Sequence, residues 1–325
     1  MVIIFNRERY KVNLNVWFYI FSTDISFRNK QQYKILKQYK ILKYYITKMH
    51  ICRIVQLSCV MLCYSFCGKI VAQTIAPSVS PLPVTDTTIL WQSDTLMSNL
   101  NRKDISWGDY TVLNSEMTIT YPINSCAANL TNKGGVGFYA YPIGQTGVSV
   151  FPMNEIAFQY DIYFDPNFDW VKGGKLPGLY GGVTGASGGN HNDNGMSARI
   201  MWRRNGGGEL YMYIPLVQDS SVTNIAIDDY PYGLSLGRNS FYFIKGQWQT
   251  VKIYMKMNDI GVNNGILELS YNNVVKISLT KINLRTMDIP INGIMFQTFF
   301  GGGDMTWKSS LNTYIKIRNM YLKVR

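Results

Sequence analysis

Two short segments combine side chains that could bind an anion and transfer protons. Ser197 and Arg199 stand two residues apart in SARIMWR, and Tyr211 and Tyr213 stand two residues apart in ELYMYIP. Side chains alternate between the two faces of a strand, so each pair shares one face of its own strand. An arginine can hold a carboxylate through two hydrogen bonds, and a nearby cation favours the phenolate form of a tyrosine. The four residues therefore predict one polar and aromatic patch.

A glycine-rich turn joins the two segments and predicts a hairpin. If the hairpin is centred near Gly206, Arg199 lies opposite Tyr213 and Met201 opposite Tyr211, about 5 Å apart. A register slip of one residue would send the tyrosines to the other face of the sheet. The alternative interpretation is an ordinary solvated sheet face, on which Tyr and Arg are common.

One lysine lies within an unusual frame of flanking glycines and a proline. Lys175 follows Gly174 and precedes the Leu176-Pro177-Gly178 turn in GGKLPGL. Glycines let a backbone approach another group closely, and proline restricts the chain. We expect this frame to hold Lys175 in place and to bring the backbone at Gly174 close to a ligand.

The surrounding pattern is that of an all-β chain. Alternating or aromatic-rich runs occur at 117–121, 155–164, 197–203, 209–217, 248–257, 266–271, 274–282, 293–300 and 314–324. Gly and Asn turns separate them, and no run of ten or more residues has a convincing helical period. Many strands with turns between them predict an antiparallel β-sandwich of the jelly-roll type, folded as a single domain.

The net charge of +12 is concentrated at the N-terminus. Residues 1–72 contain 12 Lys/Arg and 2 Asp/Glu, a net of +10. Residues 73–325 contain 20 Lys/Arg and 18 Asp/Glu, a net of only +2. A nucleic-acid-binding domain carries its positive charge on the folded part. This distribution argues against such a function.

A secretory signal peptide is predicted at residues 49–73. Arg53 is followed by an apolar stretch of 14 residues, 54–67, and the small residue Ala72 stands near a suitable cleavage point. The stretch is too short to span a membrane. We therefore expect a secreted, extracellular protein with no membrane segment in its mature form.

The signal peptide divides the chain. Residues 1–48 precede it, and the simplest interpretation is that translation starts at Met49 and that this extension is an artefact of the gene model. The alternative is a genuine extension that makes a signal anchor. Residues 74–94 are rich in Pro, Ser and Thr and predict a linker. Residues 95–325 are predicted to form the jelly-roll domain.

Few metal-binding residue types follow the signal peptide. Cys126 and His191 are the only cysteine and histidine after residue 73. No internal disulfide can form there, and we expect Cys126 to be buried as a small apolar residue. There is no second histidine after residue 73 for a metal site, and no metal and no cofactor is predicted. We expect a monomer.

Five quoted segments occur in one order along the chain. They are GGKLPGL (173–179), SARIMWR (197–203), ELYMYIP (209–215), GQWQTVKIYMKMN (246–258) and FQTFFGGGDMTW (296–307). This order resembles polysaccharide lyase family 14, the jelly-roll alginate and glucuronan lyases, over nearly all of residues 95–325. The resemblance implies an acidic polysaccharide substrate. It also implies a catalytic cleft that contains Lys175, Ser197, Arg199, Tyr211 and Tyr213.

These residue types suit the cleavage of a uronate chain by β-elimination. The enzyme must neutralise the C6 carboxylate, remove the C5 proton and protonate the leaving C4 oxygen. Lys175 and Arg199 suit the first task, and Tyr211 or Tyr213 suits the other two. Ser197 is expected to bind substrate or to position a tyrosine.

Two other functions compete with the lyase. A glycoside hydrolase needs two carboxylates across the scissile bond, and no E-x-D pair occurs in the chain. Glu209 is on the tyrosine face, and we interpret it as a rim ion pair with Arg203 that contributes weakly to substrate binding. A lectin-like module would stack sugars on aromatic residues such as Trp170. Trp170 and Gly174 are the other weaker substrate-binding candidates.

Overall fold

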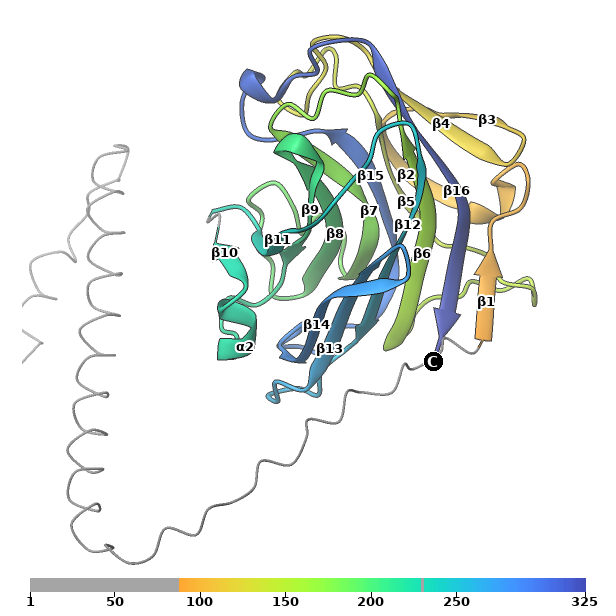
Figure 1. The fold of residues 1–325 in the computed structure, drawn as a ribbon. Coiled ribbons are helices and arrows are strands. Elements are labelled where there is room, and N and C mark those ends of the chain that lie inside the picture. Colours follow the sequence, from red (N-terminus) through yellow and green to blue (C-terminus); the bar gives the residue numbers. More distant parts are fainter. Residues whose placement is uncertain (1–87, 229–230) are drawn as a thin grey trace, which may run out of the picture. The chain divides into compact units, whose positions relative to one another are not determined.

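A computed structural model of the chain describes residues 88–228 and 231–325. The predicted N-terminal extension and signal peptide lie outside these residues. Two antiparallel sheets lie face to face (Figure 1) and enclose one large apolar core. The predicted all-β, antiparallel sandwich is confirmed.

The first sheet has eight strands within the described residues, in the order β14-β13-β12-β6-β16-β4-β3, with β1 also paired to β16. The strands are β1 (Thr88–Gln92), β3 (Thr111–Leu113), β4 (Glu116–Tyr121), β6 (Glu155–Phe164), β12 (Trp248–Lys256), β13 (Gly265–Tyr271), β14 (Val274–Ile282) and β16 (Thr313–Val324). The pairing of β1 with β16 makes Thr88 part of the first sheet. The predicted linker to residue 94 is therefore too long, and the folded domain begins earlier than residue 95.

The second sheet also has eight described strands, in the order β10-β11-β9-β8-β7-β15-β5-β2. They are β2 (Arg102–Gly108), β5 (Val136–Ala140), β7 (Gly173–Gly182), β8 (Gly195–Arg203), β9 (Gly207–Tyr213), β10 (Ala226–Asp228), β11 (Leu234–Tyr242) and β15 (Ile291–Phe300). In Figure 1, β7, β8 and β9 lie side by side near the middle of this sheet.

Within residues 88–228 and 231–325, helical structure is limited to single turns. These are η2 (Ser98–Leu100), η3 (Arg204–Gly206), α2 (Ser220–Thr223) and η4 (Met305–Trp307). Across the described ranges, no helix has the length and apolar character needed to cross a membrane.

Alternation along β8 separates the core from the opposite face of the sheet. Ala198, Ile200 and Trp202 are fully buried in the core, as predicted. Ser197 and Arg199, which alternate with them along the strand, point to the other face. The second sheet therefore has one face in the core and a polar face on the outside of the sandwich.

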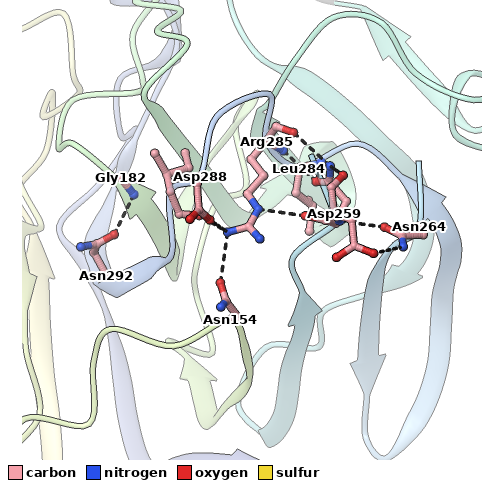
Figure 2. Close-up of polar contacts among 10 residues, drawn as sticks. Asn154, Gly182, Asp259, Asn264, Leu284, Arg285, Asp288 and Asn292 are labelled. Atoms are coloured by element: carbon pink, nitrogen blue, oxygen red, sulfur yellow. Dashed lines mark hydrogen bonds and ion pairs between the residues drawn. The ribbon is translucent and has the colours of Figure 1, made fainter. Parts of the chain in front are cut away.

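A polar network ties the loops at one end of the sandwich (Figure 2). The Arg285 guanidinium donates to Asn154 Oδ1 at 3.1 Å and to the Asn258 carbonyl at 2.9 Å, and it forms an ion pair with Asp288. Its side chain is buried, and its Nε and Nη1 donate to oxygen acceptors. Cys126 is a free, buried cysteine, which confirms the prediction made for it.

Candidate active site

A groove of about 1310 Å³ lies on the outer face of the second sheet. Its floor is formed by side chains of β7, β8, β9 and β15, namely Lys175, Arg199, Met201, Tyr211, Tyr213 and Gln297. Its walls include the glycine-rich loop after β7 and the segment 301–307 after β15. The structure thus brings four of the five predicted catalytic residues into one groove.

Ser197, the fifth residue, does not line the groove. Its hydroxyl is buried and donates a 2.6 Å hydrogen bond to the carbonyl of Ala186, in the glycine-rich loop. Ser197 also pairs with Tyr213 across the hairpin. Its contacts therefore anchor a wall of the groove beside a tyrosine.

The predicted hairpin register is wrong by two residues. Arg199 pairs with Tyr211, and Ser197 pairs with Tyr213. The turn is centred on Asn205, which adopts a left-handed backbone with φ of 58°, and not on Gly206. Because a shift of two residues keeps every side chain on its face, both tyrosines still face the groove.

Lys175 is positioned by neighbours on both sides of β7. It pairs with Met201 of β8 and Phe299 of β15. The Lys175 side chain is buried, and its Nζ lies 3.3 Å from Met201 Sδ and 4.2 Å from the centroid of the Tyr211 ring. A lysine over an aromatic face is favoured by the ring quadrupole. The ammonium group is therefore held directly beside a candidate catalytic tyrosine.

The glycines around Lys175 serve packing inside the sheet. A Cβ at Gly174 would lie 2.1 Å from the Trp202 ring, and one at Gly178 would lie 2.0 Å from the Ala198 carbonyl. GGKLPGL is part of strand β7, with a register shift between Lys175 and Gly178. The expectation that this segment is a turn, and that Gly174 approaches a ligand, is thus corrected: Gly174 makes room for a core tryptophan.

Arg199 is the most deeply buried cation of the groove, with 2% of its surface exposed. Its Nη1 donates to Gln297 Oε1 at 2.8 Å, while its Nε has no hydrogen-bond partner among the described residues. Burial lowers the pKa of Arg199, and the nearby Tyr213, Tyr139 and Tyr211 oppose that shift. A buried guanidinium with an unsatisfied donor is costly unless a hydrogen-bond acceptor completes its shell.

Both tyrosine hydroxyls accept hydrogen bonds from loop backbones. The Gly189 N–H donates to Tyr213 Oη and the Gly233 N–H donates to Tyr211 Oη, each at 2.9 Å. Burial raises the pKa of Tyr213, against the Gly189 N–H, the charge of Arg199 and a hydrogen bond from Tyr211, all of which lower it. The expectation that cations make phenolate the favoured form is therefore only part of the balance, because burial is the larger effect.

Trp170 does not belong to the groove. It is 9% exposed, packs against Phe164, Phe168 and Phe243, and accepts a hydrogen bond from Trp202 Nε1 at its carbonyl. The prediction that Trp170 stacks on sugars is therefore not supported, because the ring is part of the aromatic core.

Glu209 forms the predicted ion pair with Arg203, but not at a rim. Its carboxylate is fully buried, and Arg203 Nε donates to it at 2.7 Å. Across the hairpin Glu209 pairs with Met201, and not with Arg203 as the predicted register required. Since Glu209 does not line the groove, it contacts groove-lining residues from behind.

One floor residue, Gln297, was missed by the sequence argument, and it contacts Arg199. Met201, which was placed on the tyrosine face without a role, contacts Lys175. Gln297 stands in the quoted FQTFF run, one residue after Phe296, which is in the core. Strand alternation alone could have placed Gln297 on the groove face.

The described residues contain no group of three or more His, Cys, Asp or Glu side chains arranged to hold a metal. His191 lies in the glycine-rich loop, where its Nε2 is 2.8 Å from the Tyr232 carbonyl and its ring centroid is 5.0 Å from that of Tyr213. His191 thus packs against a floor residue of the groove.

Comparisons with known proteins agree with this architecture. The Polysaccharide lyase 14 family model matches residues 111–320. The marine PL-14 alginate lyase from Aplysia kurodai is 27% identical, with a TM-score of 0.64 over 74% of this chain and 100% of that one. The alginate lyase vAL-1 from Chlorella virus is 25% identical, with a TM-score of 0.62 over 73% of this chain and 100% of that one.

A curated relative is the exolysin of Paramecium bursaria Chlorella virus 1, 24% identical over 183 residues. That match covers 50% of this chain and 28% of the viral protein, so it spans well under two thirds of the relative's length. The family match, in contrast, extends over most of the described sandwich. The chain belongs to polysaccharide lyase family 14.

Proposed function

We propose that this protein cleaves a 4-linked polyuronate by β-elimination and leaves an unsaturated uronate end. The observation that carries the proposal is the groove floor, where Lys175 and Arg199 lie beside two tyrosines whose hydroxyls accept backbone hydrogen bonds. The two solved relatives described above are alginate lyases, so alginate is the first substrate to test.

The two cations would neutralise the carboxylate next to the reacting carbon. Loss of the C5 proton places negative charge on the C6 carboxylate group, and fixed cations in a site shielded from water stabilise such charge strongly. Arg199 has a buried Nε with no partner among the described residues, and Lys175 is held in place on β7. A substrate carboxylate would supply the acceptor that Arg199 lacks.

Tyr213 is our candidate for both proton transfers. As phenolate it would take the C5 proton, and the resulting hydroxyl would protonate the C4 oxygen as the C4–O bond breaks and the C4–C5 double bond forms. Burial raises the pKa of Tyr213, while the Gly189 N–H, Arg199 and Tyr211 act in favour of its phenolate. Tyr211, with Lys175 over its ring, would position the substrate and stabilise that charge.

A hydrolase is disfavoured by the carboxylates of the groove. Asp304 is the one acidic side chain among the described residues that line it. Glu209 is buried beneath arginines, and it does not line the groove. Hydrolysis needs a pair of carboxylates that face each other across the bond.

We also propose that the protein is secreted. The support is the basic residue, apolar stretch and small residue at 49–73. N-terminal sequencing of protein from a culture medium should begin near Thr74. Recovery of residues 1–48 on the mature protein would contradict this.

A panel of purified polyuronates tests the activity. Residues 74–325 should generate products with the ultraviolet absorbance of a C4–C5 double bond from at least one of alginate and glucuronan. New reducing ends without that absorbance would indicate a hydrolase. Binding without cleavage would indicate a lectin-like module.

A further inference from the structure

Next to the candidate catalytic residues, two arginines share one buried carboxylate. Glu209 Oε1 accepts from Arg203 Nε at 2.7 Å, and Glu209 Oε2 accepts from Arg238 Nε at 2.9 Å. Ser235 Oγ donates to the same Oε2 at 2.6 Å. These contacts join β8, β9 and β11 and fix both guanidinium groups.

The arrangement presents the cations to the groove and hides the anion. Arg203 and Arg238 line the groove with 13% and 27% of their side chains exposed, whereas Glu209 is fully buried behind them. A buried ion pair stabilises a fold little compared with apolar side chains of the same volume. Two arginines fixed in this way are, however, pre-organised to receive a further anionic group.

The position of Arg203 separates it from the reacting unit of a bound chain. Arg199 and Arg203 are on the same face of β8, four residues apart, which is about 13 Å along a strand. The Arg203 guanidinium also lies 5.6 Å from the centroid of the Tyr211 ring. With their Cα atoms this far apart along β8, Arg199 and Arg203 are spaced to meet the carboxylates of two neighbouring sugars of one chain.

The whole groove suits a polyanion. The described residues that line it include six cationic side chains, Lys172, Lys175, Arg199, Arg203, Arg204 and Arg238, against the single acid Asp304. This excess belongs to the groove, because residues 73–325 together have a net charge of only +2.

We propose that Arg203 and Arg238 form a second carboxylate-binding subsite, which holds a uronate unit away from the scissile bond. Glu209 is the positioning residue of this subsite. The inference rests on the proposed function, since it assigns the subsite to the same acidic polysaccharide. It predicts that the enzyme distinguishes long uronate chains from short ones.

The test compares Arg238→Gln with wild type on uronate oligomers of increasing length. On oligomers long enough to reach the subsite, KM should rise about tenfold or more, and kcat should change little. A tenfold change corresponds to the free energy of one charge-assisted hydrogen bond. On the shortest oligomer that is cleaved, the loss should be clearly smaller. Lys256→Gln is the matched control, because it removes one positive charge from a half-exposed position on the other sheet.

A second measurement makes the outcome independent of turnover. Binding of a long and a short oligomer is measured by calorimetry in the Lys175→Ala protein, with and without Arg238→Gln. The subsite is refuted if Arg238→Gln weakens both oligomers equally or neither. If wild type makes no unsaturated product at all, the proposed function fails instead, which is a separate result.

Glu209→Gln provides the test of positioning. It should raise KM on long oligomers as Arg238→Gln does, and the double variant should lose little more than either single variant. Fully additive losses would contradict the role of Glu209 in holding the arginines.

Discussion

Arg199 and Arg285 are both buried arginines, but their surroundings differ. Arg285 donates from Nε and Nη1 to backbone carbonyls and to Asn154, and it also pairs with Asp288 (Figure 2). Arg199 donates from Nη1 to Gln297, and its buried Nε has no partner among the described residues. The first guanidinium is satisfied by the fold, and the second one is left incomplete at a groove.

We propose that this difference separates a structural arginine, Arg285, from a functional one, Arg199. A buried donor that stays unsatisfied costs free energy, and at Arg199 such a donor coincides with the floor of a groove that a ligand could enter. Arg285 ties loops together without lining the groove, whereas Arg199 forms part of its floor. Predictions that separate activity from stability test this distinction.

The largest effect is expected at Tyr213. Tyr213→Phe keeps the ring and removes the hydroxyl, so we expect turnover to fall about 10²- to 10⁴-fold while substrate still binds. Tyr271→Phe is the matched control, because that buried hydroxyl donates to Gln249 at 2.6 Å on the first sheet. It should lower stability by about 1 kcal/mol and leave the rate unchanged. If only Tyr211→Phe is inactive, the tyrosine roles are exchanged.

The Tyr213 hydroxyl should also make kcat/KM depend on pH. Because burial raises the pKa of Tyr213, its phenolate is scarce near neutral pH in the free enzyme. The phenolate fraction below that pKa grows about tenfold per pH unit, so kcat/KM should rise from about pH 7 to about pH 9. A flat profile over that range would exclude Tyr213 phenolate as the base.

The next largest effect is a contrast between the two arginines: one substitution should lower activity, and the other should lower stability. Arg199→Gln should lower kcat/KM about 10²- to 10³-fold with an unchanged or higher Tm, because a costly buried charge is removed. Arg285→Gln should keep activity but lose about 1–3 kcal/mol, since carbonyls of Asn258 and Ile289 lose their donor. Thermal melts and product absorbance, measured on both proteins, check this. Equal losses of Tm would remove the distinction.

A smaller effect is expected at Gln297, which positions Arg199. Gln297→Ala should lower kcat/KM about tenfold, the size of one hydrogen bond to a charged group. Gln297→Glu should instead raise KM more than it lowers kcat, because its carboxylate competes with the substrate for Arg199. Asn292→Ala is the matched control, since that amide accepts from the Gly182 N–H at the other end of β15. A Gln297→Glu protein with wild-type KM would contradict the role.

The strands and the groove face were predictable where side chains alternate along the sequence. They were not predictable where packing against a neighbouring strand determines the residue type. Alternation in β8 and β9 placed Arg199 and Tyr211 on one face, as observed. Strand β7 was missed because its glycines suggest a turn, whereas Gly174 is small to admit Trp202 from a neighbouring strand. The predicted hairpin register was wrong because the turn is centred on Asn205, which adopts a left-handed backbone conformation. The sequence pattern does not show which residue of the turn adopts that conformation.

Two site assignments failed for a similar reason. Trp170 was expected on a surface, but it is buried against the nearby Phe164 and against Phe243, which comes from a distant segment. Glu209 was expected at a rim, but Ser235 and Arg238 of another strand enclose it. Burial depends on contacts between distant segments, which a local pattern does not contain.

The most direct test of the central claim is the rate of unsaturated product formation by Lys175→Ala, measured beside its melting temperature. We predict that turnover is abolished while Tm stays close to that of wild type, because Lys175 serves the substrate carboxylate at the groove and not the core. An unchanged rate would remove Lys175 from the mechanism. A collapse of Tm would assign it to the fold and contradict the account.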